Sequence, residues 1–502
     1  MGFKDGVTKR AKVLKAALLH MSIAPGQPEL NLKLLIDLIK EAAAKGAKLL
    51  VAPEMAFSGY CFENRESILP YAQDESGPAL KALRSLTAKL KVYLAVGLAE
   101  LAEPAGTLYN SAFFLNDKGR ILGRSRKINS ESRWAAPGDQ IQDNVWPTPW
   151  GRVGLHICAD SWHSLITRVT AVKGAEILLL PANWPQSGLD PTLLWRFRAL
   201  ENGLWFLACN RTGQEKNLDC LAAKSCAFDP YGQEIFVGHS PVSQVYLVDL
   251  PLDENGRVSP KRRAEIMAQR QVGQYHRLYG NFNGVQNLTG FLKLPDPGPL
   301  AITAIIPKPS ESLSSYFSRL TEPDAKGLFL WPPGAFLKSE AESSLNQLLA
   351  GQAALTKTLA GQWRFWGQGF SGPRVSGGTD GLYLTDFPPL RIWLAEPSEI
   401  VQPEAAVAAA KWGADVAIAM VDSLTPAFKL LAALRPIDQL ATVVVAPDGA
   451  AMGLPWLGHD PGRGALVGVG AMGGLTVDSH ETREKRFQDR LDFAALMKPA
   501  VL

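Results

Sequence analysis

The stretch VGLHICADSW, Val153–Trp162, decides how the rest of this chain is interpreted. Its apolar half predicts a buried strand over Gly154–Cys158, and a helix is predicted to follow over Ser164–Lys173. In α/β proteins, functional side chains gather at the carboxyl ends of strands, which is where this pattern puts Cys158. On its own, a cysteine in such a position is more often an inert core thiol. The residues that accompany it therefore have to decide its role.

The same alternation of short apolar runs and helical patterns extends through the first half of the chain. Leu32, Leu35, Ile36 and Ile39 recur at helical spacing within a helix predicted over 30–44, which Gly46 ends. Further helices are predicted over 79–90 and 193–201, strands over 13–21, 48–53, 92–97, 177–181 and 204–209, and a hairpin turn at 116–119. Strands bounded by helices indicate sheets covered by helices, so the predicted fold class is α/β.

Two further segments carry chemically useful side chains, PEMAFSGY at Pro53–Tyr60 and GRSRKIN at Gly123–Asn129. Glu54 follows a predicted strand, and Lys127 follows the predicted hairpin. A thiol is mostly protonated at neutral pH, so it needs a neighbouring base or cation before it can attack. A carboxylate can accept that proton, and an ammonium can stabilise the oxyanion of a tetrahedral intermediate. Glu54, Lys127 and Cys158 are therefore candidates for one catalytic site.

In this order, the three segments resemble the glutamate, lysine and cysteine motifs of the nitrilase superfamily, the carbon–nitrogen hydrolases. The resemblance extends over about 13–279 and includes two later motifs, RTG at Arg211–Gly213 and FDPYGQEI at Phe228–Ile235. It implies an α-β-β-α sandwich and a thioester or thioimidate intermediate on the cysteine. By matching motifs, Glu54 is expected to be the general base, Lys127 the oxyanion stabiliser and Cys158 the nucleophile.

The resemblance implies further site residues. Many members carry a second glutamate before a Pro-Gly-Asp turn, and Glu131 precedes such a turn here at 137–139. Glu131 stands only four residues after Lys127, closer than is usual, so its loop is short. The backbone N–H of Ala159 is a candidate second oxyanion donor. The other candidate substrate-binding residues are Tyr60, Trp162, Asn183 and Trp184, and for Trp184 the competing interpretation is packing between domains.

His156 and His163 flank the cysteine and raise the alternative of a cysteine–histidine pair. His156 is expected to share a strand face with Cys158, and a hydrogen-bonded structural role is preferred for it. The chain has five cysteines, all in its first half, at spacings unlike those of zinc sites. Apart from Cys158, Cys209 and Cys226 are expected to be core thiols. We expect no metal and no other cofactor, because no metal cluster, phosphate loop or flavin signature occurs.

The second half of the chain repeats part of the first. GRVGLHICADSW, which starts at Gly151, recurs as LRIWLAEPSEIV, which starts at Leu390, a shift of 390 − 151 = 239 residues. At that shift Cys158 corresponds to Pro397. The fixed shift over a whole motif predicts that the chain holds one fold twice.

A second match aligns the strand before Glu54 with 328–332, so that Glu54 corresponds to Pro333. The second copy is shorter, and the missing stretch includes the segment that carries Lys127. Neither proline offers a nucleophile, an acid or a base. The second copy is therefore expected to be degenerate and non-catalytic.

Residues 281–298, rich in Gly, Asn and Pro, separate the two similar stretches and are predicted to be a linker. The predicted domains are a catalytic one at 1–280 and a degenerate one at 299–502. Members of the superfamily usually pair subunits into a four-layer assembly. A fused second copy could supply that partner surface within one chain, so an internal pseudo-dimer is expected, and a further homo-oligomer stays open.

Composition limits the classes of partner. Of 502 residues, 46% are hydrophobic and 20% charged, which is typical of a soluble globular protein with two or more domains. A net charge of +4 without a block of like charges indicates neither a nucleic acid nor a membrane partner. The first apolar run is too short for a membrane span and lacks a cleavage site, so a cytoplasmic location is the default expectation.

The function predicted from these observations is hydrolysis of a small amide or carbamoyl compound to an acid and ammonia or an amine. A nitrile is the first alternative substrate. Nitrilases of the superfamily tend to show Trp-Glu after the cysteine and amidases Tyr-Asp, whereas this chain has Ala159-Asp160, whose aspartate favours an amidase. Acyl transfer to an amine would need a second acceptor site. The alternative from a different class is a non-catalytic binding or scaffold protein.

Overall fold

The structure, a computed structural model, divides into two compact units: a first unit that ends at Ala268 and a second unit that begins at Gln269. The residues that it describes are 12–139, 142–186, 190–279, 287–308, 327–334, 353–357, 362–367, 382–456, 463–483, 486–487 and 491–492. Within these ranges, no helix is both long and apolar enough to cross a bilayer.

The first unit contains two six-stranded sheets that face each other. The first sheet has the order β14 (Gln244–Pro251), β1 (Val13–His20), β2 (Leu49–Val51), β3 (Tyr93–Ala102), β4 (Thr107–Leu115) and β5 (Ile121–Arg126). The second has the order β13 (Glu234–Gly238), β12 (Ser225–Phe228), β9 (Trp205–Cys209), β8 (Ile177–Pro181), β7 (Gly151–Leu155) and β6 (Val145–Thr148). A separate two-stranded ribbon pairs β10 (Gln214–Glu215) with β11 (Leu218–Asp219).

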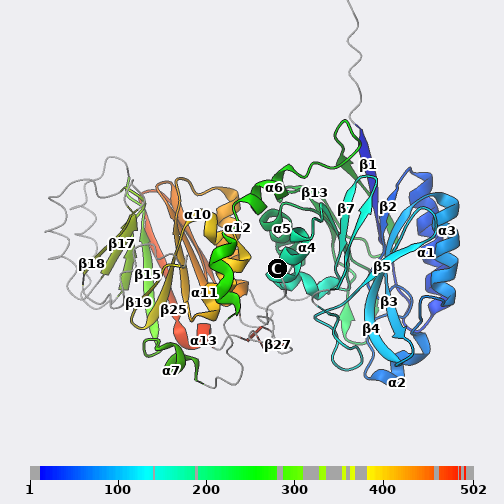
Figure 1. The fold of residues 1–502 in the computed structure, drawn as a ribbon, viewed down its shortest axis with the longest axis horizontal. Helices are drawn as coiled ribbons and strands as arrows, with labels where there is room; N and C mark the ends of the chain where they lie inside the picture. Colours follow the sequence, from blue (N-terminus) through cyan, green and yellow to red (C-terminus); the bar gives the residue numbers. More distant parts are fainter. Residues whose placement is uncertain are drawn as a thin grey trace, which may run out of the picture. The chain divides into compact units, whose positions relative to one another are not determined.

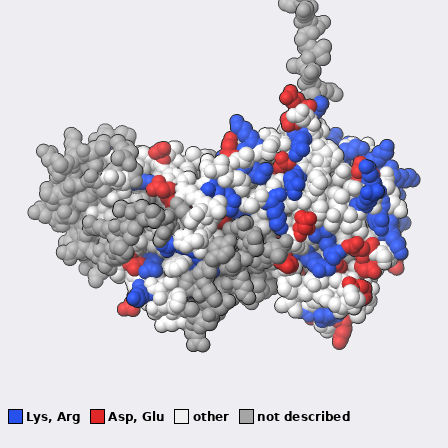
Figure 2. Space-filling model, in the orientation of Figure 1, with Lys and Arg blue, Asp and Glu red and all other residues white. Residues whose placement is uncertain are grey.

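Helices cover the outer face of each sheet, as Figure 1 shows. The first sheet is covered by α1 (Pro28–Ala44) and α3 (Pro78–Leu90), and the second by α4 (Ser164–Val172) and α5 (Pro191–Asn202). Shorter elements are α2 (Arg65–Ile68), η1 (Leu69–Tyr71) and α6 (Lys261–Ala268). The layers therefore run α-β-β-α, which confirms the predicted sandwich. On the face in Figure 2, lysine and arginine side chains are numerous over this unit, with aspartate and glutamate among them.

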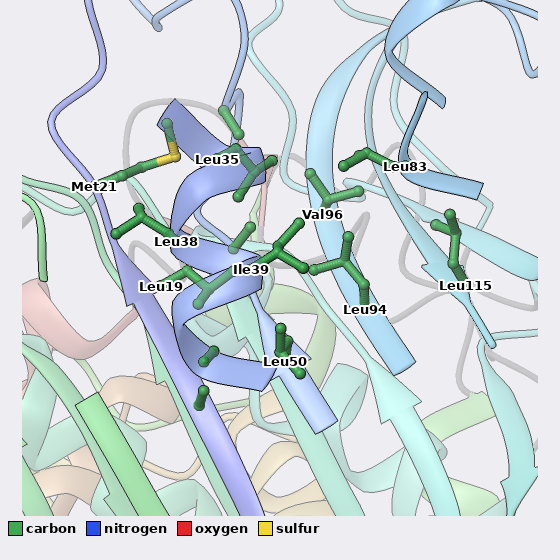
Figure 3. Packing of buried hydrophobic residues seen from close by; sticks show 14 of the residues in the cluster. Leu19, Met21, Leu35, Leu38, Ile39, Leu50, Leu83, Leu94, Val96 and Leu115 are labelled. Atoms are coloured by element: carbon green, nitrogen blue, oxygen red, sulfur yellow. The ribbon is translucent and has the colours of Figure 1, made fainter. Parts of the chain in front are cut away.

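The periodicity of α1 explains how the helix is held on its sheet. Pro28 occupies its first turn, where the missing N–H is harmless, and Gly46 with a φ of +88° allows the chain to turn away after the helix. Leu35, Leu38 and Ile39 project inward and pack against side chains of β1, β2 and β3 (Figure 3). Truncating one such leucine to alanine is expected to destabilise the fold by about 2–5 kcal/mol.

Strand direction brings the candidate catalytic segments to one edge of the sandwich. β1, β2 and β3 are parallel, and β5 runs the same way as β3 because each is antiparallel to β4. β7, β8 and β9 are also parallel to one another. Glu54, Lys127 and Cys158 follow the carboxyl ends of β2, β5 and β7, which is where α/β folds collect functional side chains.

The second unit repeats the strand order of the first. Its sheets are β18 (Trp363–Gly367), β17 (Ala353–Lys357), β16 (Gly327–Leu330), β15 (Pro299–Ile305) and β25 (Met472–Asp478), and β19 (Leu384–Phe387), β20 (Leu390–Ala395), β21 (Val416–Met420), β22 (Ala441–Ala446), β23 (Gly449–Gly453) and β24 (Gly464–Val467). Its helices and remaining strands are η3 (Val272–Tyr279), α7 (Leu288–Leu292), α10 (Pro397–Ile400), α11 (Pro403–Lys411), α12 (Pro426–Leu434), η4 (Arg435–Asp438), α13 (Ser479–Arg483), β26 (Arg486–Phe487) and β27 (Leu491–Asp492).

Strand register and hydrogen bonds preserve the predicted shift of 239 residues. Val153 pairs with Ile177 between β7 and β8, and Ile392 pairs with Val416 between β20 and β21. The N–H of Arg152 donates to Glu176 at 2.7 Å, and the N–H of Arg391 donates to Asp415 at 2.8 Å. Each acidic side chain also pairs with an arginine: Glu176 with Arg257, which follows β14, and Asp415 with Arg483, which follows β25. Within the described residues, the strand order and register of the two sheets are thus repeated at the predicted shift.

The division between the units differs from the predicted one. It lies at Ala268–Gln269, whereas the catalytic domain was predicted to reach residue 280. η3 packs against α11, with Tyr275 and Leu278 buried and Lys411 Nζ donating to the Leu278 carbonyl at 2.6 Å. Of the predicted linker, 281–286 lie outside the described residues, and the rest includes α7. A Gly- and Pro-rich composition predicts where the chain turns, but side-chain burial decides to which unit a segment belongs.

Candidate active site

Three charged side chains meet inside the first unit. Lys127 Nζ donates to Glu54 Oε1 at 2.7 Å and also to Glu131 Oε1. Asn110, on β4, joins the two carboxylates, since its Nδ2 donates to Glu54 Oε1 at 2.7 Å and to Glu131 Oε2 at 3.0 Å. All four residues are buried. Glu54 Oε2 binds none of these three side chains, and the Glu54 carboxylate also interacts with the Cys158 thiol, so it can accept the thiol proton.

Cys158 lies in the turn that follows β7 of the second sheet. The strand ends at Leu155, three residues earlier than predicted, and Cys158 opens the short 3-10 turn η2 (Cys158–Trp162). Its φ is +44°, a strained value for a residue with a side chain. The apolar run before the cysteine predicted a longer strand, but the positive φ turns the chain sharply at Cys158. Turns of this kind present a nucleophile at the end of a strand.

Asp160 ties the lysine segment to the cysteine segment. Its Oδ1 accepts the backbone N–H groups of Ile128 and Asn129, both at 2.9 Å, and its Oδ2 accepts that of Ile157 at 3.3 Å. These donors directly follow Lys127 and directly precede Cys158. Burial raises the pKa of Asp160 to about 7, against the opposing effect of these hydrogen bonds. One carboxylate therefore fixes the distance between two strand ends from different sheets.

Asn183 and Tyr60, both predicted to bind substrate, lie at the charged cluster. Asn183 Nδ2 donates to the backbone carbonyl of Glu54 at 2.9 Å, and its backbone N–H interacts with the Cys158 thiol. The Tyr60 hydroxyl donates to Glu131 and lies 3.4 Å from Lys127 Nζ. Each of the two residues therefore positions a catalytic candidate.

Burial and the charges of the cluster together set the ionisation of the site. Burial and then the Glu54 charge raise the pKa of Cys158 well above its usual value, with only partial opposition from Lys127. Burial also raises the pKa of Glu54 despite the nearby ammonium. For Glu131, burial is outweighed by Lys127 and by the hydrogen bonds it receives, so its pKa is lowered. For Lys127, burial is outweighed by the two carboxylates, so its pKa is raised well above its usual value. The resting thiol is thus neutral, and Glu54 is the carboxylate suited to proton uptake.

The tryptophans beside the site pack against one another within the first unit. Trp162 stacks on Trp184 with ring centroids 5.7 Å apart, and Trp184 meets Trp195 edge-on at 5.9 Å. Arg198 on α5 holds the η2 turn by donating to the carbonyls of Ser161 and Trp162, each at 2.7 Å. Ala159 is part of the same turn. The aromatic stack therefore supports the turn that carries Cys158.

The histidines that flank the cysteine have structural surroundings. His156 Nε2 is hydrogen-bonded to Thr170 Oγ1 at 2.8 Å, and burial lowers its pKa to about 3. Burial also lowers the pKa of His163 to about 3. Cys209 and Cys226 are buried in β9 and β12. In the part of the chain that the structure describes, no group of three or more His, Cys, Asp or Glu side chains is arranged to hold a metal ion.

Comparison with known proteins shows to which family the chain belongs. The sequence profile described as carbon-nitrogen hydrolase matches residues 15–258, which lie within the first unit. A nitrilase of Pyrococcus abyssi is 30% identical over 271 residues, which cover 53% of this chain and 100% of that protein. The chain belongs to the carbon–nitrogen hydrolase family. That identification confirms the superfamily predicted from the three motifs.

Other carbon–nitrogen hydrolases match the same part of the chain. An omega-amidase of Xenopus tropicalis is 28% identical over 279 residues, which cover 53% of this chain and 96% of that protein. The crystal structure of Nit3 from Saccharomyces cerevisiae, a member of branch 10 of the nitrilase superfamily, is 23% identical. It covers 52% of this chain and 97% of its own, with a TM-score of 0.46.

In the second unit, the corresponding strand ends carry different residues. Pro333 follows β16, the counterpart of β2, and Pro397 follows β20, the counterpart of β7. The described part of the first sheet of the second unit ends at β18, the counterpart of β4, so it offers no strand equivalent to β5. Within the described residues, the glutamate, lysine and cysteine of the first unit thus have no equivalents.

The sequence did not predict three residues around the site: Asn110, Arg198 and Glu215, whose carboxylate accepts the backbone N–H of Tyr60 at 2.9 Å. Asn110 is one polar residue within a strand, and Arg198 is one charged residue within a helix. Their partners are distant in the chain, so no local pattern marks them. Glu215 follows the RTG motif by two residues, which is the one signal that could have pointed to it.

Proposed function

We propose that the first unit hydrolyses a non-peptide C–N bond in a small amide or carbamoyl compound through a thioester on Cys158. The observation that carries this proposal is the Glu54–Lys127–Glu131 cluster beside a thiol at a strained turn. A thiol that is neutral at rest requires a base at the moment of attack, and the raised pKa of Glu54 suits that task. Homology to an omega-amidase supports an amide substrate.

In the first step, Cys158 Sγ bonds to the substrate carbonyl carbon while Glu54 Oε2 accepts the thiol proton. The carbonyl oxygen becomes an oxyanion, which Lys127 and the N–H of Ala159 stabilise. The C–N bond then breaks, and the amine leaves with the proton from Glu54. The acyl group stays on sulfur as a thioester.

In the second step, Glu54 accepts a proton from water as the water oxygen attacks the thioester carbon. The C–S bond breaks, the acid leaves, and the proton returns to the thiolate. Glu131 stays ionised throughout and holds Lys127 in position. Tyr60, Asn183, Trp162 and Trp184 are proposed to border the substrate.

A nitrile is the second candidate substrate, because a nitrilase is among the relatives. Attack on a nitrile carbon gives a thioimidate, and two water molecules are then needed to release the acid and ammonia. The same residues serve both routes, so substrate specificity decides between them.

The test is product analysis with a panel of small amides, carbamoyl amino acids and nitriles. Both the acid and the released ammonia or amine are measured, so that amides that release amines are not missed. Cys158→Ala is expected to abolish turnover, and Cys226→Ala, which removes another buried thiol, is expected to retain it. Turnover retained in Cys158→Ala would overturn the mechanism. No turnover of any compound, together with specific binding of one, would favour the non-catalytic alternative.

The second unit is proposed to be non-catalytic and to replace, within one chain, the partner subunit of other family members. Its proline residues at the two corresponding strand ends support the first part of this proposal. Limited proteolysis with sizing tests the second part: stable association of the two fragments is expected, and separation into independent fragments would contradict it. A cytoplasmic location stays a prediction from the sequence.

A further inference from the structure

Glu215, in the two-stranded ribbon, anchors the loop that carries Tyr60. Its Oε2 accepts the backbone N–H of Tyr60 at 2.9 Å and that of Cys61 at 2.8 Å. Its Oε1 lies 3.1 Å from the same Tyr60 nitrogen. The Glu215 side chain is only 2% exposed. Hydrogen bonds from two successive backbone N–H groups to one buried carboxylate fix both the position and the direction of that backbone.

Arg211 compensates the charge of Glu215 and is itself fully engaged. Its Nη1 pairs with Glu215 Oε1, its Nη2 donates to the Ile23 carbonyl at 2.8 Å, and its Nε donates to the Thr212 carbonyl at 3.0 Å. A buried ion pair is weak evidence for stability, because an apolar pair of similar volume is often as good. What this pair supplies is a fixed orientation of the Glu215 carboxylate, because hydrogen bonds between a planar guanidinium and a carboxylate form only in a narrow range of geometries.

The anchored loop leads directly to the catalytic candidates. Gly59, with a φ of +82°, brings the loop so close that an added Cβ would lie 3.0 Å from Glu215 Oε1. One residue later, the Tyr60 hydroxyl donates to Glu131, which in turn binds Lys127. A continuous chain of contacts thus runs from Arg211 through Glu215 and Tyr60 to the Glu131–Lys127 pair.

We propose that Glu215, held by Arg211, is a positioning residue that acts through Tyr60 to keep Glu131 and Lys127 in their reactive geometry. The proposal rests on the proposed function only in that Lys127 and Glu131 serve the reaction. Glu215 is not expected to touch the substrate. Its main effect is expected on the reaction step, because the Tyr60 hydroxyl that it positions binds Glu131.

A matched control is present in the same two segments. Lys216, the residue after Glu215, pairs with Glu63 at 2.7 Å, but both side chains are about 70% exposed. Such a surface pair contributes little. Glu215→Gln and Glu63→Gln therefore each remove one negative charge that links the ribbon to the Tyr60 loop. The charge of Glu215 is buried, and that of Glu63 is exposed.

The decisive experiment is a double-mutant cycle with Glu215→Gln and Tyr60→Phe, in which kcat and KM are measured for the amide that the enzyme hydrolyses. Glu215→Gln is expected to lower kcat by about 10- to 100-fold with KM changed less than about threefold, because small displacements of catalytic groups have effects of this size. When Glu215→Gln is added to Tyr60→Phe, kcat is expected to fall by less than about threefold relative to Tyr60→Phe alone, because the hydrogen bond from the hydroxyl to Glu131 is already lost. Additive losses, or an unchanged kcat in Glu215→Gln, would overturn the proposal. Glu63→Gln is expected to match the parent protein.

A second readout separates this proposal from the proposed function. The pH dependence of Cys158 alkylation by iodoacetamide, followed by peptide mapping, needs no substrate. Glu215→Gln, Tyr60→Phe and the double variant are expected to share one displaced midpoint, because each disturbs Lys127, whose charge acts on the thiol. A merely structural loss would lower the folded fraction and leave this midpoint unchanged, which would contradict the proposal. If Glu215→Gln does not fold, Arg211→Lys is used in its place. Its alkylation midpoint is expected to be displaced less than that of Tyr60→Phe but in the same direction. An unchanged midpoint would overturn the proposal.

Discussion

Lys127 Nζ lies 2.7 Å from Glu54 Oε1, and both side chains are completely shielded from solvent. Glu131 binds the same ammonium, so one buried positive charge compensates two carboxylates. Removal of one partner from a buried ion pair leaves the other charge unsatisfied, which destabilises far more than the intact pair stabilises. Substitutions in this cluster are therefore expected to change both turnover and the free energy of unfolding, and the two quantities can be measured for each residue.

Replacement of Glu54 by glutamine separates turnover from thiol reactivity. Loss of the proposed general base is expected to lower amide turnover by about 10²- to 10⁴-fold. Burial raises the pKa of Cys158, and the Glu54 charge raises it further; since the substitution removes that charge, the midpoint of Cys158 alkylation by iodoacetamide should move to lower pH. Glu66→Gln, an exposed change on α2, should alter neither quantity. A midpoint that moves to higher pH would contradict this account.

Lys127→Met leaves Glu54 and Glu131 without their shared cation. We expect the free energy of unfolding, measured by urea denaturation at pH 7, to fall by about 3–5 kcal/mol, the usual consequence of breaking a buried pair. Turnover should be lost as well. Lys118→Met removes an exposed lysine from the β4–β5 turn and should change the free energy by less than about 0.5 kcal/mol. Equal effects of the two substitutions would refute the role given to the buried cluster.

Asp160→Asn tests the carboxylate that joins the lysine and cysteine segments. In the folded protein, burial raises the pKa of Asp160 to about 7, above the usual aspartate value of about 3.8. The contribution of this group to stability is therefore complete below about pH 3.8 and is lost as the pH rises towards 7. The difference in Tm between the parent protein and Asp160→Asn should become smaller, or change sign in favour of the variant, from pH 5 to pH 8. A difference that grows with pH would show that the aspartate is stabilised in its charged form.

Three buried histidines predict acid sensitivity of the first unit. Burial lowers the pKa of His20 to about 4 and those of His156 and His163 to about 3. Because the unfolded chain takes up these protons first, their contribution is complete above about pH 6.5 and is lost as the pH falls towards 4. In His156→Gln, the slope of unfolding free energy against pH in this range should decrease by about 1.4 kcal/mol per pH unit. An unchanged slope in His156→Gln would contradict the prediction.

Much of the fold was accessible from the sequence because its signals are local. Helix α1 follows from the spacing of Leu35 and Ile39 and from Gly46, all within one short segment. The duplication followed from one fixed shift, because a repeated fold repeats its hydrophobic pattern. The order of the glutamate, lysine and cysteine motifs was sufficient for the family. Boundaries were less accurate: β7 ends at Leu155, because the positive φ of Cys158 depends on packing around η2 and not on the apolar run before it.

The sequence by itself determined the α/β class, the repeated strand pattern and the family, and it predicted Glu54, Lys127, Glu131 and Cys158 as the candidate catalytic residues. Only the tertiary structure decided how these side chains are held. Asn110 bridges Glu54 and Glu131, Asp160 joins the two strand ends, and Glu215 anchors Tyr60 from 155 residues away in the chain. The pKa directions of the site were equally out of reach, because they depend on burial. Contacts and burial arise when distant segments pack together, and no local periodicity encodes which polar side chain will meet which.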